Sequence, residues 1–274
     1  MASLRSGRAR PEESLRSGRA RPADEGRVEL VGGNALAAAW FGRIDYEVAW
    51  SWQRSLFDAR LDGRCGDSVV LVEHPPTYTL GRSALESDVL YGQAEREARG
   101  IRTYHVDRGG RATYHGPGQL VGYPIVALGA RYDVLGYLRR IEAALIALLA
   151  DHGVEGTRDA RHTGVWVGAS KIAAIGVKIT RGVTMHGFAL NVATDLEMFG
   201  GIVPCGITDR GVTSLEVETG SSPPLEGIAL QAATHLAVAF ERELAWQQPH
   251  SLLASGGVDV AAATSEPAVA GALG

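Results

Sequence analysis

Cysteine and lysine are scarce in this sequence of 274 residues. The two cysteines, Cys65 and Cys205, do not form a C-x-x-C pair, which argues against a disulfide scaffold or a structural zinc site. Of the 27 basic side chains, only Lys171 and Lys178 are lysines. A lysine retained in a chain that prefers arginine indicates a need for a compact amine that can lose its proton.

Long apolar runs are missing as well. No stretch of about eighteen apolar residues, the length that spans a membrane, occurs. No apolar segment follows the first arginines, as it would in a secretory signal. We therefore expect a cytoplasmic protein with no membrane segment. With 45% hydrophobic and 21% charged residues, the chain has the composition of a globular protein.

The two ends of the chain differ in composition from its middle. The nonapeptide SLRSGRARP occurs at residues 3–11 and again at 14–22, within an arginine-rich, apolar-poor stretch. We predict a disordered basic extension over residues 1–27, a catalytic domain over 28–246 and a flexible small-residue tail over 247–274. The net charge of -4 provides no overall basic field, so we expect no nucleic-acid partner.

The middle of the chain carries helix and strand patterns in separate blocks. Residues 44–63 and 132–153 have apolar side chains at helical spacing, and a further helix is expected near 225–244. Within residues 67–82, a β-branched run predicts a buried strand that is stopped by Pro75 and Pro76. Residues 163–192 predict a meander of antiparallel strands. The expected fold class is α+β, with a mixed, largely antiparallel sheet and packed helices.

One cysteine stands in a context that favours reactivity. Cys205 lies in the turn Pro-Cys-Gly within GGIVPCGITDRGVTSLE, where a side chain is exposed. A free thiol with a pKa of about 8.5 is mostly protonated at neutral pH, so a nucleophilic cysteine needs a nearby base or cation. Cys65 lies in the loop DGRCGDS, and we assign it no catalytic role.

A second candidate feature is the glycine-rich segment DRGGRATYHGPGQLVGYPIV at residues 107–126. Gly109 and Gly110 allow the backbone to approach a ligand, and the turn at 116–118 would fix the direction of His115. This pattern predicts a ligand-binding wall, with a tight surface hairpin as the alternative. It matches neither the phosphate-binding loop nor the dinucleotide fingerprint.

Four segments together resemble the lipoyl(octanoyl) transferase family over about residues 28–244. They are EHPPTYTLGR at 73–82, the segment at 107–126, GVWVGASKIAAIGVKITRGVTMHGFALNV at 164–192 and FGGIVPCGITDRGVTSLE at 199–216. The resemblance implies a single domain of the biotin/lipoate protein ligase type.

The resemblance also implies a reaction. Cys205 would take an octanoyl group from octanoyl-acyl carrier protein and pass it to a lysine amine of a lipoyl domain, the first step of endogenous lipoate synthesis. The expected acceptors are 2-oxoacid dehydrogenases and the glycine cleavage H protein. Lys171 matches the family's lysine, whose charge would lower the pKa of Cys205 and which could later act as a base. No metal, ATP or other diffusible cofactor is implied.

The resemblance assigns the binding of the acyl chain to three segments. The residues are Arg108, Gly109, Gly110, Arg111, Ala112, Thr113, Tyr114, His115, Ala174, Ile175, Gly176, Gly187, Phe188 and Ala189. Small and apolar residues suit an eight-carbon chain, which has no polar atom beyond its carbonyl. Arg111 stands where the family more often has glutamine, a change that affects polarity on the substrate side.

Other roles near the site stay open at this point. For His115 positioning is favoured over catalysis, and His186 is expected to shape a strand edge. Backbone amides near Gly206, or in the Gly109-Gly110 loop, are the candidate oxyanion donors. Arg108 and Arg111 are the candidates for a basic patch that an acidic carrier protein would meet.

Three alternative functions compete with the transferase. An ATP-dependent lipoate-protein ligase shares the expected fold but activates a free acid and uses no nucleophilic cysteine. A cysteine hydrolase could combine Cys205 with His115 or His186. A non-catalytic module could bind its partner through residues 1–27.

Overall fold

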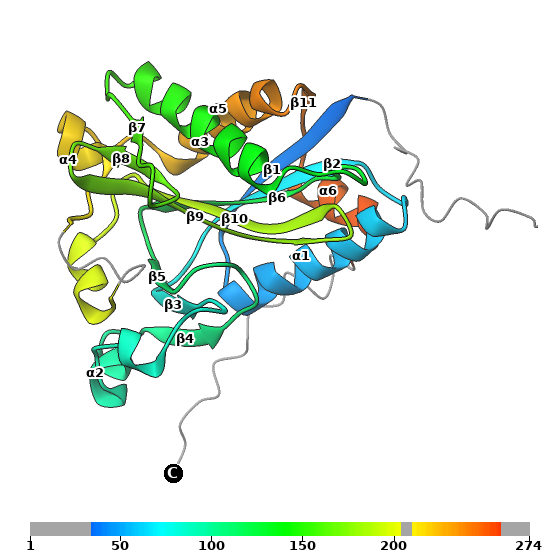
Figure 1. The fold of residues 1–274 in the computed structure, drawn as a ribbon. Coiled ribbons are helices and arrows are strands. Elements are labelled where there is room, and N and C mark those ends of the chain that lie inside the picture. The colour runs from blue at the N-terminus through cyan, green and yellow to red at the C-terminus, as the bar shows by residue number, and fades with distance from the viewer. Residues whose placement is uncertain (1–33, 204–209, 259–274) are drawn as a thin grey trace, which may run out of the picture.

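The structure is a computed structural model that describes residues 34–203 and 210–258. The duplicated nonapeptide, Cys205 and the last part of the C-terminal stretch lie outside these residues. The described chain forms an eight-stranded sheet and a three-stranded sheet. Figure 1 shows the large sheet between two layers of helices, with the small sheet beside one end. None of the helices found in the described ranges is long and apolar enough to cross a membrane.

The large sheet is mostly antiparallel. Its strand order is β11-β1-β2-β6-β10-β9-β8-β7, and only the pairs β11·β1 and β1·β2 are parallel within it. The strand bounds in this order are Glu243–Trp246, Ala35–Arg43, Asp67–Glu73, Gln119–Ile125, Val183–Asn191, Ser170–Thr180, Val165–Val167 and Thr157–Arg158.

Helices cover both faces of this sheet. Helices α3 (Val134–Asp151) and α5 (Leu225–Ala239) pack on one face, while α1 (Tyr46–Leu61) and α6 (Pro249–Ser255) pack on the other (Figure 1). Strands β2, β6 and β10 are buried along their whole lengths. A strand covered on both faces has few positions left for polar side chains, which explains the continuous apolar runs in the sequence.

The small sheet holds one loop against the large sheet. It consists of β4 (Arg102–His105), β3 (Thr77–Leu80) and β5 (Ala112–His115), in the order β4-β3-β5. Short helical segments flank it: η1 (Glu86–Asp88), α2 (Gln93–Ala98) and η2 (Leu196–Gly201), and α4 (Leu215–Thr219) follows farther along the chain. Between β4 and β5, the amide of Gly109 donates to the carbonyl of Val177 on β9 at 2.9 Å.

The expected fold class is confirmed, as are the helices predicted at 44–63 and 132–153 and the antiparallel meander over 163–192. The helix predicted over 225–244 ends earlier, at Ala239, and β11 follows it. Glu241 has a left-handed φ of 59°, which turns the chain toward β1. Four residues that pair at a sheet edge carry no periodic signal, so the sequence pattern missed this strand.

The packed part of the chain extends past the boundary placed at residue 246. Helix α6 follows it, and Leu252 and Leu253 are buried against α1 and the large sheet. Their apolar surface provides the free energy for packing, although the surrounding serine, alanine and glycine residues gave the segment the composition of a tail. The extension predicted at 1–27 lies outside the described residues and stays a prediction.

Candidate active site

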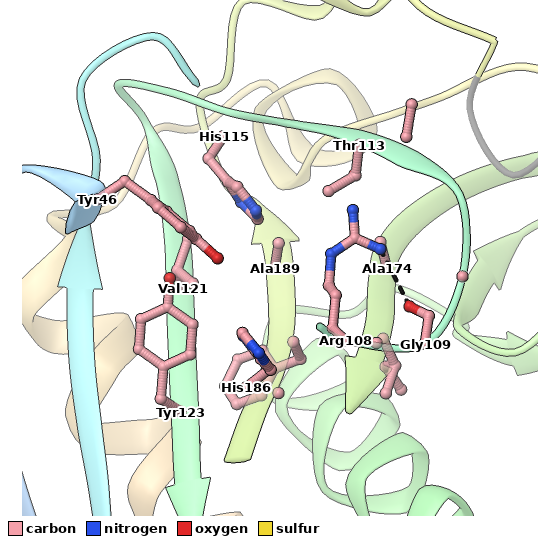
Figure 2. Close-up of a pocket in the computed structure, with 16 residues that line it drawn as sticks. Tyr46, Arg108, Gly109, Thr113, His115, Val121, Tyr123, Ala174, His186 and Ala189 are labelled. Atoms are coloured by element: carbon pink, nitrogen blue, oxygen red, sulfur yellow. Dashed lines mark hydrogen bonds between the residues drawn. The ribbon is translucent and has the colours of Figure 1, made fainter. Parts of the chain in front are cut away.

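A cavity lies between the β9–β10 part of the large sheet and the loop that precedes β5 (Figure 2). We call it the central cavity. Its lining residues are Tyr46, Arg108, Gly109, Gly110, Ala112, Thr113, His115, Val121, Tyr123, Ala174, Ile175, Gly176, His186, Gly187, Phe188 and Ala189. The three segments that the family resemblance assigned to acyl binding therefore meet around one space, although they lie far apart in the sequence.

Two of the predicted binding residues point elsewhere. The guanidinium of Arg111 pairs with the carboxylate of Asp88, which holds the pKa of that carboxyl below its usual range. Tyr114 packs in the small sheet, with its ring against Tyr78 and Phe199. Arg111 therefore links the chain just before β5 to η1, and Tyr114 contributes to the core of the small sheet.

Glycines allow the walls of the central cavity to come close together. A β-carbon at Gly176 would lie 2.9 Å from the carbonyl oxygen of Gly109. A β-carbon at Gly187 would lie 2.1 Å from the carbonyl oxygen of Gly122 on β6. Larger residues at these two positions would push apart the loop and the strands that form the cavity.

The Arg108 side chain forms part of the wall rather than of the surface. It is 8% exposed, and Figure 2 shows its guanidinium beside Thr113 and Ala174. One of its terminal nitrogens donates to the carbonyl and the hydroxyl of Thr79, at 2.6 and 2.9 Å. The expectation that Arg108 contributes to a surface patch for a carrier protein is therefore wrong, because the guanidinium is buried in these hydrogen bonds.

A chain of hydrogen bonds links His115 to the other side of the site. Its Nδ1 donates to Gln119 Oε1 at 2.9 Å, and its Nε2 lies 3.3 Å from the hydroxyl of Thr79. The Gln119 amide donates to Asn191, whose own amide donates to the carbonyl of Thr213. Burial holds the pKa of His115 well below its ordinary value. A neutral ring engaged at both nitrogens is suited to positioning, the role the sequence favoured.

The sequence analysis did not select three residues of the cavity wall, Tyr46, Val121 and Tyr123. Tyr46 is the first residue of α1 and stacks on His115, with ring centroids 5.9 Å apart. Val121 and Tyr123 lie on β6, and the Tyr123 hydroxyl contacts Nε2 of His74 at 2.6 Å. Nothing in their local sequence distinguishes them from core residues, because only the tertiary structure brings them to the cavity.

His186 lines the cavity through an unusual backbone conformation. Its φ is 58°, in the left-handed region that non-glycine residues rarely adopt. Its Nε2 lies 2.7 Å from Asp107 Oδ1, and Lys178 Nζ lies 2.6 Å from the other carboxylate oxygen. Burial lowers the pKa of His186, and the hydrogen bond to Asp107 opposes that shift. The neutral ring therefore donates to the carboxylate.

Lys171 lies near the start of β9, beside a second, smaller cavity. That cavity is lined by Thr113, Gln119, Lys171, Ala174, Ala189, Asn191, Phe199 and Val212. Three of these residues, Thr113, Ala174 and Ala189, also line the central cavity. The two cavities are therefore adjacent, and Lys171 belongs to the end opposite His186.

The Lys171 ammonium has defined neighbours. Its Nζ donates to the carbonyl of Thr163 at 3.3 Å and lies 4.8 Å from the centre of the Trp166 ring. The Arg210 guanidinium lies over the same ring at 5.0 Å and pairs with Asp159 at 2.7 Å. Two cations therefore gather around one buried indole, which stabilises positive charge at this end of the site.

Cys205 lies outside the described residues, but residues on both sides of it in the sequence reach Lys171. Phe199 and Val212 line the same small cavity as Lys171. The Lys171 amide donates to Gly211 at 2.9 Å, and the Thr213 amide donates to the Lys171 carbonyl at 3.0 Å.

Cys65 is buried, which the loop sequence around it did not predict. It is 6% exposed, and its Sγ lies 3.8 Å from the carbonyl of Leu56 on α1. Burial raises the pKa of its thiol. No catalytic role is assigned to Cys65, because a protonated and buried thiol is a poor nucleophile.

The sequence analysis named backbone amides near Gly206 and in the Gly109-Gly110 loop as the candidate oxyanion donors. The Gly109 amide donates to the carbonyl of Val177 and is therefore not available to an oxyanion, and Gly206 lies outside the described residues.

Over residues 34–203 and 210–258, no group of three or more histidine, cysteine or acidic side chains is arranged to hold a metal ion. The expectation of a reaction without a metal or a cofactor stays a prediction.

Comparison with known proteins assigns the chain to a family. Residues 45–237 match the lipoyl protein ligase A/B catalytic domain. A crystal structure of lipoate-protein ligase A bound with ATP superposes with a TM-score of 0.68 at 13% identity, covering 81% of this chain and 92% of that one. A bipartite lipoate protein ligase from Thermoplasma acidophilum gives 0.67 at 12% identity, covering 81% and 90%. These structures show the shared fold.

Sequence relatives narrow the assignment. An octanoyltransferase of Chloroflexus aggregans is 50% identical over 204 residues, covering 73% of this chain and 92% of its own length. An octanoyltransferase of Rubrobacter xylanophilus is 51% identical over 189 residues, covering 68% and 85%. The chain therefore belongs to the lipoyl protein ligase A/B catalytic domain family. Within that family it is a member of the octanoyltransferases, as the sequence motifs predicted.

Proposed function

We propose that this enzyme transfers an octanoyl group from octanoyl-acyl carrier protein to a lysine amine of lipoyl domains, through a thioester on Cys205. The family membership supports the octanoyl transfer, and the meeting of the three acyl-binding segments around the central cavity carries the proposal. The acceptors are lipoyl domains of 2-oxoacid dehydrogenases and the glycine cleavage H protein. We also propose that the reaction takes place in the cytoplasm.

In the first half-reaction, the thiolate of Cys205 attacks the thioester carbonyl of the donor. The bond from the carbonyl carbon to the carrier's sulfur breaks, and the departing thiolate takes a proton from the Lys171 ammonium. A nearby ammonium favours thiolate over thiol, so Lys171 also prepares the nucleophile. The support is the position of Lys171 beside residues that flank Cys205 on both sides in the sequence.

In the second half-reaction, the neutral amine of the lipoyl domain attacks the acyl-enzyme. The amide bond forms, Cys205 leaves as a thiolate, and the amine's surplus proton passes to the neutral Lys171. The enzyme returns to its starting protonation state, so the cycle requires no ATP, metal or diffusible cofactor. His115 positions the wall and does not transfer a proton, because it is buried, neutral and hydrogen bonded at both nitrogens.

The acyl chain would lie in the central cavity, with its carbonyl near Lys171. Small residues line the part that both cavities share, where Ala174 on β9 is paired with Ala189 on β10. Phe188 and Ile175 add apolar surface farther along. Each methylene moved from water into such a slot contributes about 0.8 kcal/mol.

Intact-protein mass spectrometry tests the proposal. The enzyme is exposed to octanoyl-acyl carrier protein without ATP, and a lipoyl domain is added afterwards. We expect one octanoyl adduct on wild type and on Cys65→Ala, none on Cys205→Ala, and loss of the adduct as the lipoyl domain gains the same mass. Transfer that requires ATP and free octanoate would instead establish the ligase, and release of free octanoate without an acceptor would establish the hydrolase.

A further inference from the structure

The central cavity has a direction, set by the pairing of β9 with β10. Lys171 and Asn191 belong to the small cavity at one end, and the pair Ala174–Ala189 belongs to both cavities. Gly176, paired with Gly187, lies farther along, and His186 is the last position of β10 that reaches the space. A chain that starts near Lys171 and follows these strands therefore meets the His186 side chain.

The His186 side chain lies on the α1 side of the large sheet, the side from which Tyr46 of α1 also lines the cavity. Along a regular strand, alternate residues share a face, so His186 would point to the same side as Phe188. Phe188 packs in the core beside α3 and α5, whereas the His186 ring lies near Trp50 on α1, with centroids 6.3 Å apart. The left-handed conformation at φ 58° turns the imidazole to the α1 side.

Two polar contacts hold His186 in this conformation. Its backbone amide donates to Oε1 of the buried Gln53 at 3.1 Å, and its Nε2 donates to Asp107 at 2.7 Å. The carboxylate of Asp107 is 41% exposed and is also bound by Lys178, so the imidazole separates the cavity from a surface ion pair. A longer apolar chain would have to displace an anchored ring and place methylenes against charged groups.

We propose that His186 is the end wall of the acyl cavity and determines the length of acyl chain that the enzyme accepts. This inference rests on the proposed octanoyl transfer and names a specificity residue for it. An aliphatic side chain at this position could change rotamer to admit a longer chain. The imidazole bound to Asp107 resists such a change, because moving it breaks a hydrogen bond to a carboxylate.

The test compares octanoyl and dodecanoyl donors on acyl carrier protein, as the ratio of kcat/KM for the two chains. We expect wild type to favour octanoyl, and His186→Gly to raise the dodecanoyl-to-octanoyl ratio about tenfold or more. Glycine tolerates the left-handed conformation, so this variant removes the ring without a new strain. His186→Asn, which also tolerates that conformation and has a shorter side chain, provides a second variant if the first does not fold.

Lys178→Ala is the matched control, because Lys178 binds the same carboxylate but does not line the cavity. We expect it to leave the ratio of the two chains unchanged. An unchanged ratio in the folded His186 variants, or an equal increase in Lys178→Ala, would overturn the inference.

Calorimetric binding of free octanoic and dodecanoic acids repeats the comparison without turnover. The inference requires dodecanoic acid to gain affinity in the His186 variants alone. Absence of transfer by wild type would count against the proposed function, whereas a chain-length preference that does not change in the variants would count against the role of His186.

Discussion

The main chains of Lys171 and Thr213 are joined by a hydrogen bond of 3.0 Å, which the Thr213 amide donates to the Lys171 carbonyl. Together with the bond from the Lys171 amide to Gly211, it lays the chain that follows Cys205 beside the start of β9. The polar chain from His115 through Gln119 and Asn191 ends on the carbonyl of the same Thr213. Hydrogen bonds therefore connect the acyl-binding wall with the lysine end of the site.

Lys171→Ala should reduce octanoyl transfer by a factor of about 10² to 10⁴, the usual contribution of a positioned acid or base. Lys171→Arg separates the two proposed roles, because arginine keeps the positive charge but does not lose its proton. We expect the arginine variant to form the acyl-enzyme more slowly than wild type, because it keeps the charge beside Cys205 but cannot protonate the departing thiolate, and to fail in transfer to the lipoyl domain. Single-turnover measurements of each half-reaction check this, and normal transfer by either variant would contradict it.

Thiol labelling should distinguish the two cysteines. Burial raises the pKa of Cys65, so near neutral pH its thiol carries less thiolate than a free cysteine and is shielded from reagent. We expect iodoacetamide to modify Cys205 in the native protein, and both cysteines after denaturation. Peptide mapping by mass spectrometry identifies the labelled residue, and rapid modification of native Cys65 would show that the prediction is wrong.

Stability should fall as the pH is lowered through the range in which His74 titrates. Burial lowers the pKa of His74 from 6.5 to about 4, and its Nδ1 donates to the carbonyl of Ile44. Between these two values the unfolded chain binds a proton that the folded chain does not, so the stabilisation is complete above 6.5 and is lost toward 4. This difference in proton binding lowers the free energy of unfolding by about 3 kcal/mol over that range.

Urea unfolding at several pH values between 7 and 4 measures this dependence. His74→Gln cannot titrate at this position. Between pH 7 and 4 its free energy of unfolding should therefore fall by about 3 kcal/mol less than that of wild type. Carboxylates that titrate in the same range affect both proteins equally, and identical pH slopes would rule out the role of His74.

Gln119→Leu should cost about 1–3 kcal/mol of unfolding free energy, because it leaves buried polar groups of His115 and Asn191 without partners. Octanoyl transfer should also decrease, since the wall formed by His115 loses its anchor. Gln93→Ala is the matched control, because Gln93 makes an exposed pair with Glu97 on α2. Chemical denaturation should show a change within about 0.5 kcal/mol for this control.

Gly176→Ala should raise the KM for the octanoyl donor, because the new β-carbon meets the Gly109 carbonyl and the Arg108 side chain at the cavity wall. Gly227→Ala is the control in α5, where a β-carbon meets nothing within 4 Å. It should leave transfer unchanged and stabilise the protein by up to about 1 kcal/mol. Steady-state kinetics and thermal unfolding on both variants provide the comparison, and an equal KM in the two would contradict a narrow cavity at Gly176.

Some helices and strands could be predicted from the sequence, because local patterns of residues determine them. The helices α1 and α3 follow from apolar spacing along 44–63 and 132–153, and the meander follows from β-rich runs punctuated by glycine. Strand β11 and helix α6 could not be predicted in the same way. Pairing with β1 determines the first, and packing of Leu252 and Leu253 against α1 determines the second.

The sequence by itself determined the family, the fold class and the residues that supply chemistry, because motifs in a fixed order are properties of the chain. The tertiary structure decided which of those residues share a space: it placed Arg108 in the cavity wall, Arg111 on Asp88 and Tyr114 in the core of the small sheet. It also turned His186 toward α1 against the alternation of its strand. Long-range packing and hydrogen bonds select these orientations, and no local pattern encodes them.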